Sequence, residues 1–136
     1  MKKLKLLFVL PLFTLFLSCS NNNQETAAPT LAGQWKLVNV TGGFVGVNDN
    51  FPAGQITWNI DTANNSVTVV NNNTNPDAQD ILETGVYSYT LAPDPNAICP
   101  NTFNVNNLDL GCYTVSDNEL IITYDYADGF RLRLIR

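Results

Sequence analysis

Residues 119–136 read ELIITYDYADGFRLRLIR, which is two short apolar-alternating runs on either side of a turn. Asp128-Gly129 is the strongest turn signal in the chain, because both residue types accept the positive backbone φ of a type I′ hairpin turn. After this turn Phe130, Leu132 and Leu134 alternate with polar residues. A period of two predicts two antiparallel strands with one packed face and one face in water.

The chain from residue 31 onward repeats this pattern. Its apolar-alternating runs are broken by clusters of Asn, Asp, Gly and Pro, and no stretch holds a helical period, so we predict an all-β domain. Asn64-Asn65 and Asp117-Asn118 mark further tight turns, so at least part of the sheet should be an antiparallel meander. The eight predicted strands span residues 34–40, 55–61, 66–71, 85–91, 102–105, 112–115, 119–126 and 130–135. Longer connections are expected at 42–54, 72–83 and 92–101.

Alternation also assigns side chains to the packed face. Trp35 and Leu37 share one side of the first predicted strand, and Ile56, Trp58 and Ile60 share one side of the second. Residues 31–136 form one domain that is large enough for a single modest core.

Residues 1–18, MKKLKLLFVLPLFTLFLS, have the layout of a secretory signal. Lysines form a basic start, and an apolar run of about a dozen residues follows. This run is shorter than the ~20 residues that a transmembrane helix needs. We therefore expect a signal peptide, and export of everything after it.

The chain has three cysteines, Cys19, Cys99 and Cys112, which is an odd number for an exported protein. Cys99 and Cys112 both lie within the domain, and an oxidising compartment permits them to form a disulfide. The alternative for these two residues is a pair of buried free thiols. In either case Cys19 is left over.

Cys19 stands where the apolar run ends and a run of asparagines begins. The stretch Phe16-Leu17-Ser18-Cys19 resembles the lipobox of bacterial lipoproteins, in which the signal is cut before the cysteine and the thiol receives a diacylglyceryl group. The resemblance implies that acyl chains such as palmitate anchor Cys19 in a membrane of the cell envelope, with the outer membrane as the expected location. Residues 19–30 would then be the lipidated cysteine and a flexible tether.

The two ends of the domain, LAGQWKLVNVTGG and DGFRLRLIR, resemble lipocalin-like domains of the calycin type, especially the small lipoproteins of Bacteroidetes. The resemblance implies a small antiparallel up-and-down β-barrel of about eight strands. In such a barrel Gly33 lets the chain enter, Trp35 closes the floor, and an arginine packs across the indole. Arg131, Arg133 and Arg136 are the candidates, and Arg131 or Arg133 is favoured because each lies inside the last predicted strand. META-type domains begin with a comparable Gly-x-Trp-x-Leu run and are the rival family.

Composition excludes several classes of function. From residue 19 onward the chain has four basic and twelve acidic residues, a net charge of about −8, which repels phosphate backbones and excludes nucleic-acid binding. The chain has no histidine, which removes the usual nucleophile activation, imidazole metal sites and the common general base. We therefore expect no catalytic residue, metal or cofactor, and a protein that is not an enzyme.

The resemblance implies a ligand as well as a fold. The possible ligand-lining residues are Trp58, Tyr87, Tyr89, Tyr124 and Tyr126. Aromatic residues at strand period are more often barrel wall or core, and an eight-stranded barrel is either filled by its own side chains or holds one small ligand. The expected function is binding of a small apolar or amphipathic ligand by a monomer, and the alternative is a structural or protein-interaction module with a filled barrel.

Overall fold

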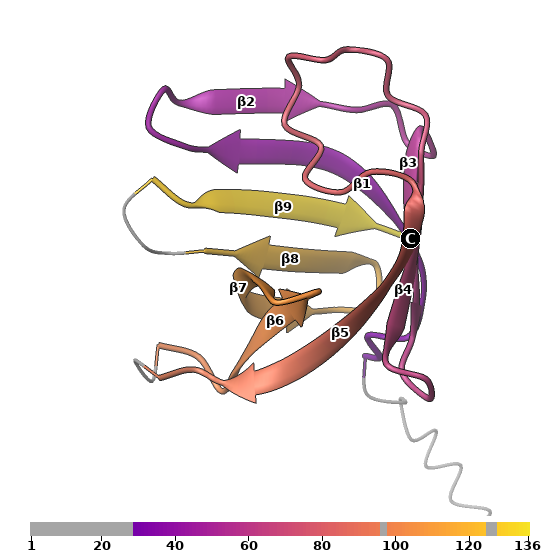
Figure 1. Cartoon of the computed structure of the whole chain (residues 1–136), viewed down its shortest axis with the longest axis vertical. Helices are drawn as coiled ribbons and strands as arrows, with labels where there is room; N and C mark the ends of the chain where they lie inside the picture. The colour runs from indigo at the N-terminus through magenta and orange to yellow at the C-terminus, as the bar shows by residue number, and fades with distance from the viewer. Residues whose placement is uncertain (1–28, 96–97, 125–127) are drawn as a thin grey trace, which may run out of the picture.

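The computed structural model describes residues 29–95, 98–124 and 128–136 (Figure 1). The secondary structure within these ranges consists of strands, which confirms the predicted all-β class. The strands are β1 (Gly33–Gly42), β2 (Val47–Asn50), β3 (Ile56–Asp61), β4 (Ser66–Asn71), β5 (Gly85–Pro93), β6 (Asn101–Val105), β7 (Leu108–Val115), β8 (Glu119–Thr123) and β9 (Phe130–Ile135).

Eight of the strands close into an antiparallel barrel. The sheet order is β2-β1-β3-β4-β5-β6-β7-β8-β9, and an additional pairing joins β1 to β9. Closure therefore runs through β1 and β3–β9, and β2 is an extra strand attached to β1. This confirms the predicted up-and-down barrel of about eight strands.

Strand β1 pairs with three neighbouring strands because it is long and irregular. Its first half, Gly33–Leu37, pairs with β3, and its second half, Asn39–Gly42, pairs with β2. Its other edge pairs with β9, with a register shift between Leu37 and Asn39. A bulge bends a strand and increases its twist, and Figure 1 shows β1 curving from the lower part of the barrel toward β2.

Strand β2 corrects the prediction that residues 42–54 are only a connection. Its sequence is Val-Asn-Asp-Asn, which lacks apolar alternation because the strand lies at the edge of the sheet and covers no core. Asn39 of β1 holds it instead, since its side-chain amide donates to Oδ1 of Asn48 at 3.0 Å and to Oδ1 of Asn50 at 3.1 Å. The other boundaries differ less, although β8 ends at Thr123 and β7 already begins at Leu108.

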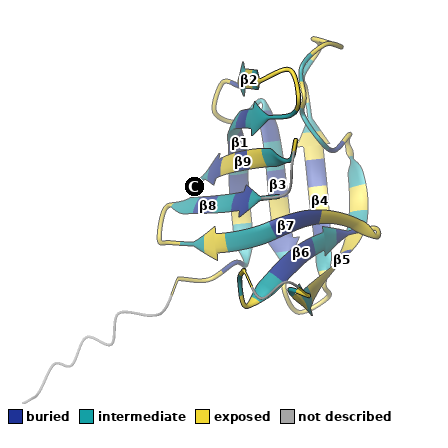
Figure 2. Ribbon diagram, turned by 90° about the vertical axis from the view of Figure 1, so that its left-hand side faces the viewer, coloured by how far each residue is buried: buried dark blue, intermediate teal, exposed yellow. Residues whose placement is uncertain are grey.

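The inward faces agree with the predicted alternation, because buried residues alternate with more exposed ones along β3, β4 and β9 (Figure 2). Trp35 and Trp58 lie opposite each other on β1 and β3, and both are fully buried. Tyr89 stacks on Phe103 with ring centroids 5.0 Å apart. Burial raises the pKa of Tyr89, and the nearby Tyr113 adds to this shift. The middle of the barrel is therefore a packed core of the barrel's own side chains.

The two ends of the barrel differ. One end, called the floor here, carries the chain entry at residues 29–32, the turns at 62–65 and 116–118, and the C-terminus. The opposite end, called the mouth, carries the turn at 43–46 and the connection 72–84, which arches across the top of Figure 1. This connection folds back onto the barrel, since Leu82 is buried and the Gln79 backbone N–H donates to Oδ2 of Asp49 at 2.8 Å.

Candidate functional site

The mouth of the barrel contains a pocket of about 550 Å³. Its walls come from the connection between β4 and β5, the start of β7, and both sides of the turn between β8 and β9. This volume lies within the range of roughly 300 to 1,000 Å³ that is typical of small-molecule sites. We call it the mouth pocket.

Most of the mouth pocket is lined by apolar or aromatic side chains. These residues are Ile81, Leu108, Leu110, Tyr124, Phe130 and Leu132. Leu110 and Leu132 belong to the buried core, whereas Leu108 is half exposed at the rim. An apolar ligand in this pocket would lie directly against the end of the packed interior.

Ile81 has an unusual backbone conformation, with φ at 67°. A positive φ in a β-branched residue is a genuine outlier, because Cβ crowds the following carbonyl. Residues held in such conformations cost about 1 to 3 kcal/mol and cluster at ligand clamps and active sites. The strain here falls on a residue that lines the mouth pocket.

The charged residues that line the mouth pocket are both negative. Asp109 lies on β7 and Asp128 in the turn before β9, and both are exposed. The backbone N–H of Gly111 donates to Oδ1 of Asp109 at 2.9 Å, which orients that carboxylate. Asp128 has φ at 65°, a left-handed conformation that Asp tolerates, but Gly129 lacks the positive φ that the predicted type I′ turn requires.

Among the predicted ligand-lining residues that the structure describes, one is at the mouth pocket. Tyr124 lines it. Trp58 and Tyr89 are buried in the core instead. Tyr87 is partly buried and packs against that core, and its hydroxyl donates to the Glu83 carbonyl at 2.9 Å. Tyr126 lies outside the described residues.

The aliphatic wall of the mouth pocket was not predicted from the sequence. Phe130 and Leu132 were assigned to the packed face, which is correct, but they are also the inward residues closest to the turn after β8. In a barrel the inward residues next to the turns of one end face its opening. Proximity to the Asp128-Gly129 turn was therefore the signal that could have found them.

The floor of the barrel is closed by Trp35, whose indole Nε1 donates to the Leu31 carbonyl at 2.8 Å. The guanidinium that covers this ring belongs to Arg136, with Cζ 4.1 Å from the ring centroid. The expectation that favoured Arg131 or Arg133 is therefore wrong. Both alternate outward on β9, and Arg133 instead pairs with Glu119 across the sheet surface at 2.6 Å.

Arg136 reaches the indole because it follows the last residue of β9 and turns back under the floor. Its guanidinium also donates to the carbonyls of Thr30 and Ala32. It thereby links the end of the chain to the segment that enters the barrel. Gly33, the predicted entry residue, has φ at 114°, a conformation that favours glycine.

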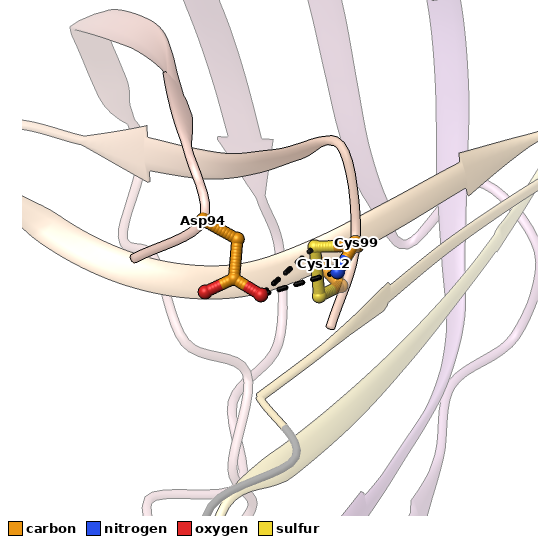
Figure 3. Close-up of side chains that lie close together, drawn as sticks. All are labelled: Asp94, Cys99 and Cys112. Atoms are coloured by element: carbon orange, nitrogen blue, oxygen red, sulfur yellow. Dashed lines mark hydrogen bonds between the residues drawn. A yellow bond between two sulfur atoms is a disulfide. The ribbon is translucent and has the colours of Figure 1, made fainter. Parts of the chain in front are cut away.

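Cys99 and Cys112 form a disulfide in the structure, with Asp94 beside it (Figure 3). The Asp94 carboxylate accepts hydrogen bonds from the backbone N–H groups of Ile98 at 2.6 Å and Cys99 at 3.1 Å. Its oxygen and the two sulfurs lie within 4.8 Å of one another, a spacing that suits a metal ion. Thiolates rather than disulfide sulfurs are metal ligands, so the paired sulfurs make this cluster a cross-link and not a metal centre.

A second, polar groove of about 590 Å³ lies along residues 71–84. Its central carboxylate, Asp80, is satisfied internally, because the side-chain amides of Asn71 and Asn73 donate to Oδ2 at 2.8 Å and 3.0 Å. Asn71 also donates to the Leu82 carbonyl at 3.0 Å. This network shapes the connection that carries Ile81 to the mouth pocket.

The predicted signal peptide and Cys19 lie outside the described residues. Among the residues that are described, no helix is long and apolar enough to cross a membrane. Comparison of the chain with protein-family models, with curated proteins and with solved structures finds no match.

Proposed function

We propose that this protein is a lipid-anchored protein of the cell envelope that binds a small apolar or amphipathic ligand in the mouth pocket, without catalysis. The observation that carries the proposal is the pocket of about 550 Å³, with walls of aliphatic and aromatic side chains, at one end of a barrel whose interior is otherwise filled. Resemblance of the chain ends to lipocalin-like lipoproteins supports the same function.

The strained Ile81 adds a second, independent argument for a ligand at the mouth. Strain of this kind persists only where the surrounding structure imposes it, here through the hydrogen-bonded connection 71–84. A segment under no functional demand would relieve the strain by placing Gly or Asn at this position. An isoleucine instead presents an apolar surface to the pocket.

The anchor is supported by the sequence around Cys19 and by the place where the chain enters the barrel. Thr30 and Ala32 lie at the floor, where Arg136 binds their carbonyls. A tether that ends at residue 30 would therefore join the barrel at the end opposite the mouth. Lipidation is tested by mass spectrometry of the membrane fraction, where an unmodified Cys19 that still carries residues 1–18 would contradict it.

Ligand binding is tested with Ile81→Asn in the lipidated protein, reconstituted in lipid nanodiscs and titrated with 2-naphthylmethanol by calorimetry. Empty nanodiscs give the blank. Asn accepts the left-handed conformation, so stability should stay within about 1 kcal/mol of the native protein. Affinity should fall about three- to tenfold, because apolar surface is lost from the pocket.

The matched control is Val86→Asn, which removes a β-branched side chain from the exposed outer face of β5. Its affinity should equal that of the native protein. Absence of saturable binding to the native protein, or equal losses in both variants, would contradict a ligand site at the mouth.

The second candidate function is a protein-interaction module, and a specific feature supports it. The turn between β1 and β2 exposes Phe44 and Val45, with 87% and 84% of their surfaces in water. This apolar tip lies near the mouth, since the adjacent Gly43 donates its backbone N–H to the Gly129 carbonyl at 3.1 Å. Two results together would favour this function. The native protein would not bind 2-naphthylmethanol, and the Phe44→Ser substitution would abolish binding of a membrane-associated partner.

A further inference from the structure

The charges around the mouth pocket restrict the chemistry of its ligand. Its charged lining residues are Asp109 and Asp128, and Gln79 is the other polar side chain in its wall. Among the described residues, no basic side chain lines it. A ligand with an acidic head group would find carboxylates at the rim and no counter-charge.

The basic residues of the described chain do not line the mouth pocket. Arg136 covers Trp35 at the floor, and Arg133 is paired with Glu119. Lys36 and Arg131 alternate with inward residues of β1 and β9 and therefore point away from the barrel interior. The negative potential at the mouth is thus not offset by the pocket wall.

Aromatic side chains strengthen the preference for positive charge. Tyr124 and Phe130 line the same pocket and lie within four residues of Asp128 in the sequence. Ring faces attract ammonium groups electrostatically, and carboxylates at an exposed rim attract them over several ångströms. An acidic lining combined with aliphatic and aromatic walls fits a molecule that is apolar at one end and cationic at the other.

We propose that the mouth pocket selects a cationic amphiphile, whose apolar body lies against Leu110 and Leu132 and whose ammonium group stays at the rim near Asp109 and Asp128. This inference rests on the proposed function, because it names the chemical class of the ligand for the same pocket. Anionic amphiphiles such as fatty acids are disfavoured by like charge at the rim and by the lack of a basic partner.

The test uses three probes that share one ring system and differ in charge: 2-naphthylmethylammonium, 2-naphthylmethanol and 2-naphthoate. Each is titrated by calorimetry into the lipidated protein in nanodiscs of a neutral lipid, with empty nanodiscs as the blank. The ammonium probe should bind about three- to tenfold tighter than the alcohol at low salt, and the carboxylate probe should bind most weakly. The preference should shrink at about 0.5 M salt, because exposed charges are screened.

The variant that isolates the charges is Asp109→Asn combined with Asp128→Asn. Asn keeps the oxygen that accepts from Gly111 and tolerates the left-handed conformation at position 128, so the fold should be kept. In this variant the ammonium probe should bind no more tightly than the alcohol, so the ammonium preference should disappear. Asp117→Asn removes one carboxylate from the turn at the floor and should leave the preference intact.

The outcomes separate this inference from the proposed function. Equal affinity for all three probes, a preference for the carboxylate, or an ammonium preference that survives in the double variant would overturn the cationic selectivity and leave ligand binding standing. Absence of saturable binding for all three probes would overturn the proposed function, and the selectivity with it.

Discussion

Trp35 and Trp58 show how two identical buried side chains can have different roles. They face each other across β1 and β3, and both are fully buried. The indole N–H of Trp35 donates to the Leu31 carbonyl and its ring carries Arg136, whereas Nε1 of Trp58 has no hydrogen-bond partner among the described residues. A buried donor without a partner costs about 1 to 3 kcal/mol.

The substitutions Trp35→Phe and Trp58→Phe should therefore differ. Both remove similar apolar volume, but Trp35→Phe also loses a hydrogen bond and the better ring for the cation. We expect Trp35→Phe to lower the free energy of unfolding by about 1 to 2 kcal/mol more than Trp58→Phe does. Urea denaturation followed by the remaining tryptophan and by far-UV circular dichroism measures this, and equal losses would contradict the assigned roles.

The contact between Arg136 and Trp35 was not predicted from the sequence, because the position of Arg136 depends on how the chain leaves the barrel. Substitution Arg136→Ala should cost about 1 to 2 kcal/mol of stability, since it removes the guanidinium from Trp35 and from the carbonyls at the chain entry. Arg131→Ala is the control, and this outward residue should change stability by less than about 0.5 kcal/mol. A similar loss in both variants would mean that the contact with Trp35 contributes little.

Among the elements, β7 and β8 approach closely at Gly111. This residue has φ at 89°, and a Cβ added to it would lie 2.2 Å from the Thr123 carbonyl oxygen. Gly33 also has a positive φ, but a Cβ there would meet nothing within 4 Å. Substitutions at the two glycines therefore separate the energetic cost of backbone strain from the cost of a steric clash.

Gly33→Ala should lower the free energy of unfolding by about 1 to 2 kcal/mol, because it introduces strain alone. Gly111→Ala adds a backbone clash and should cost at least about 1 to 3 kcal/mol more. Thermal and urea denaturation of both variants measures the difference. A Gly111→Ala variant as stable as Gly33→Ala would show that β7 and β8 are not held at this separation.

The disulfide ties the segment before β6 to β7, across a sequence separation of 13 residues. In the chain-entropy account, closing a loop of this size contributes about 3 kcal/mol by restricting the unfolded chain. The double variant Cys99→Ser, Cys112→Ser should lose about that much stability, and reductant should then have no further effect on it. A loss below about 1 kcal/mol would contradict a stabilising role for the cross-link.

At the level of elements the sequence was most informative where a strand buries one face. Runs such as Ile56–Asp61 and Phe130–Ile135 alternate apolar and polar residues because one side of each faces the core. Strand β2 was not predicted because its two faces bury no core and three of its four residues are polar. Closure between β1 and β9 depends on pairing of residues almost a hundred positions apart, which local patterns do not encode.

For the whole molecule, the sequence predicted a barrel. It did not decide whether the barrel interior is filled by side chains or holds a ligand. The structure combines the two, because the middle is packed by side chains and the pocket lies at the mouth. Of the predicted lining residues that the structure describes, only Tyr124 lines this pocket. The others were chosen as aromatic, but the position of a residue along its strand, and not its type, decides whether it reaches the opening.

The central claim is that the mouth pocket binds a small ligand, and a chemical-shift map tests it most directly. The ¹⁵N-labelled lipidated protein in nanodiscs is titrated with 2-naphthylmethylammonium, and amide shifts are followed. We predict saturable shifts at Ile81, Leu110 and Phe130, with Gly33 and Asn118 at the floor unchanged. Shifts that do not saturate, or that centre on the floor, would contradict the claim.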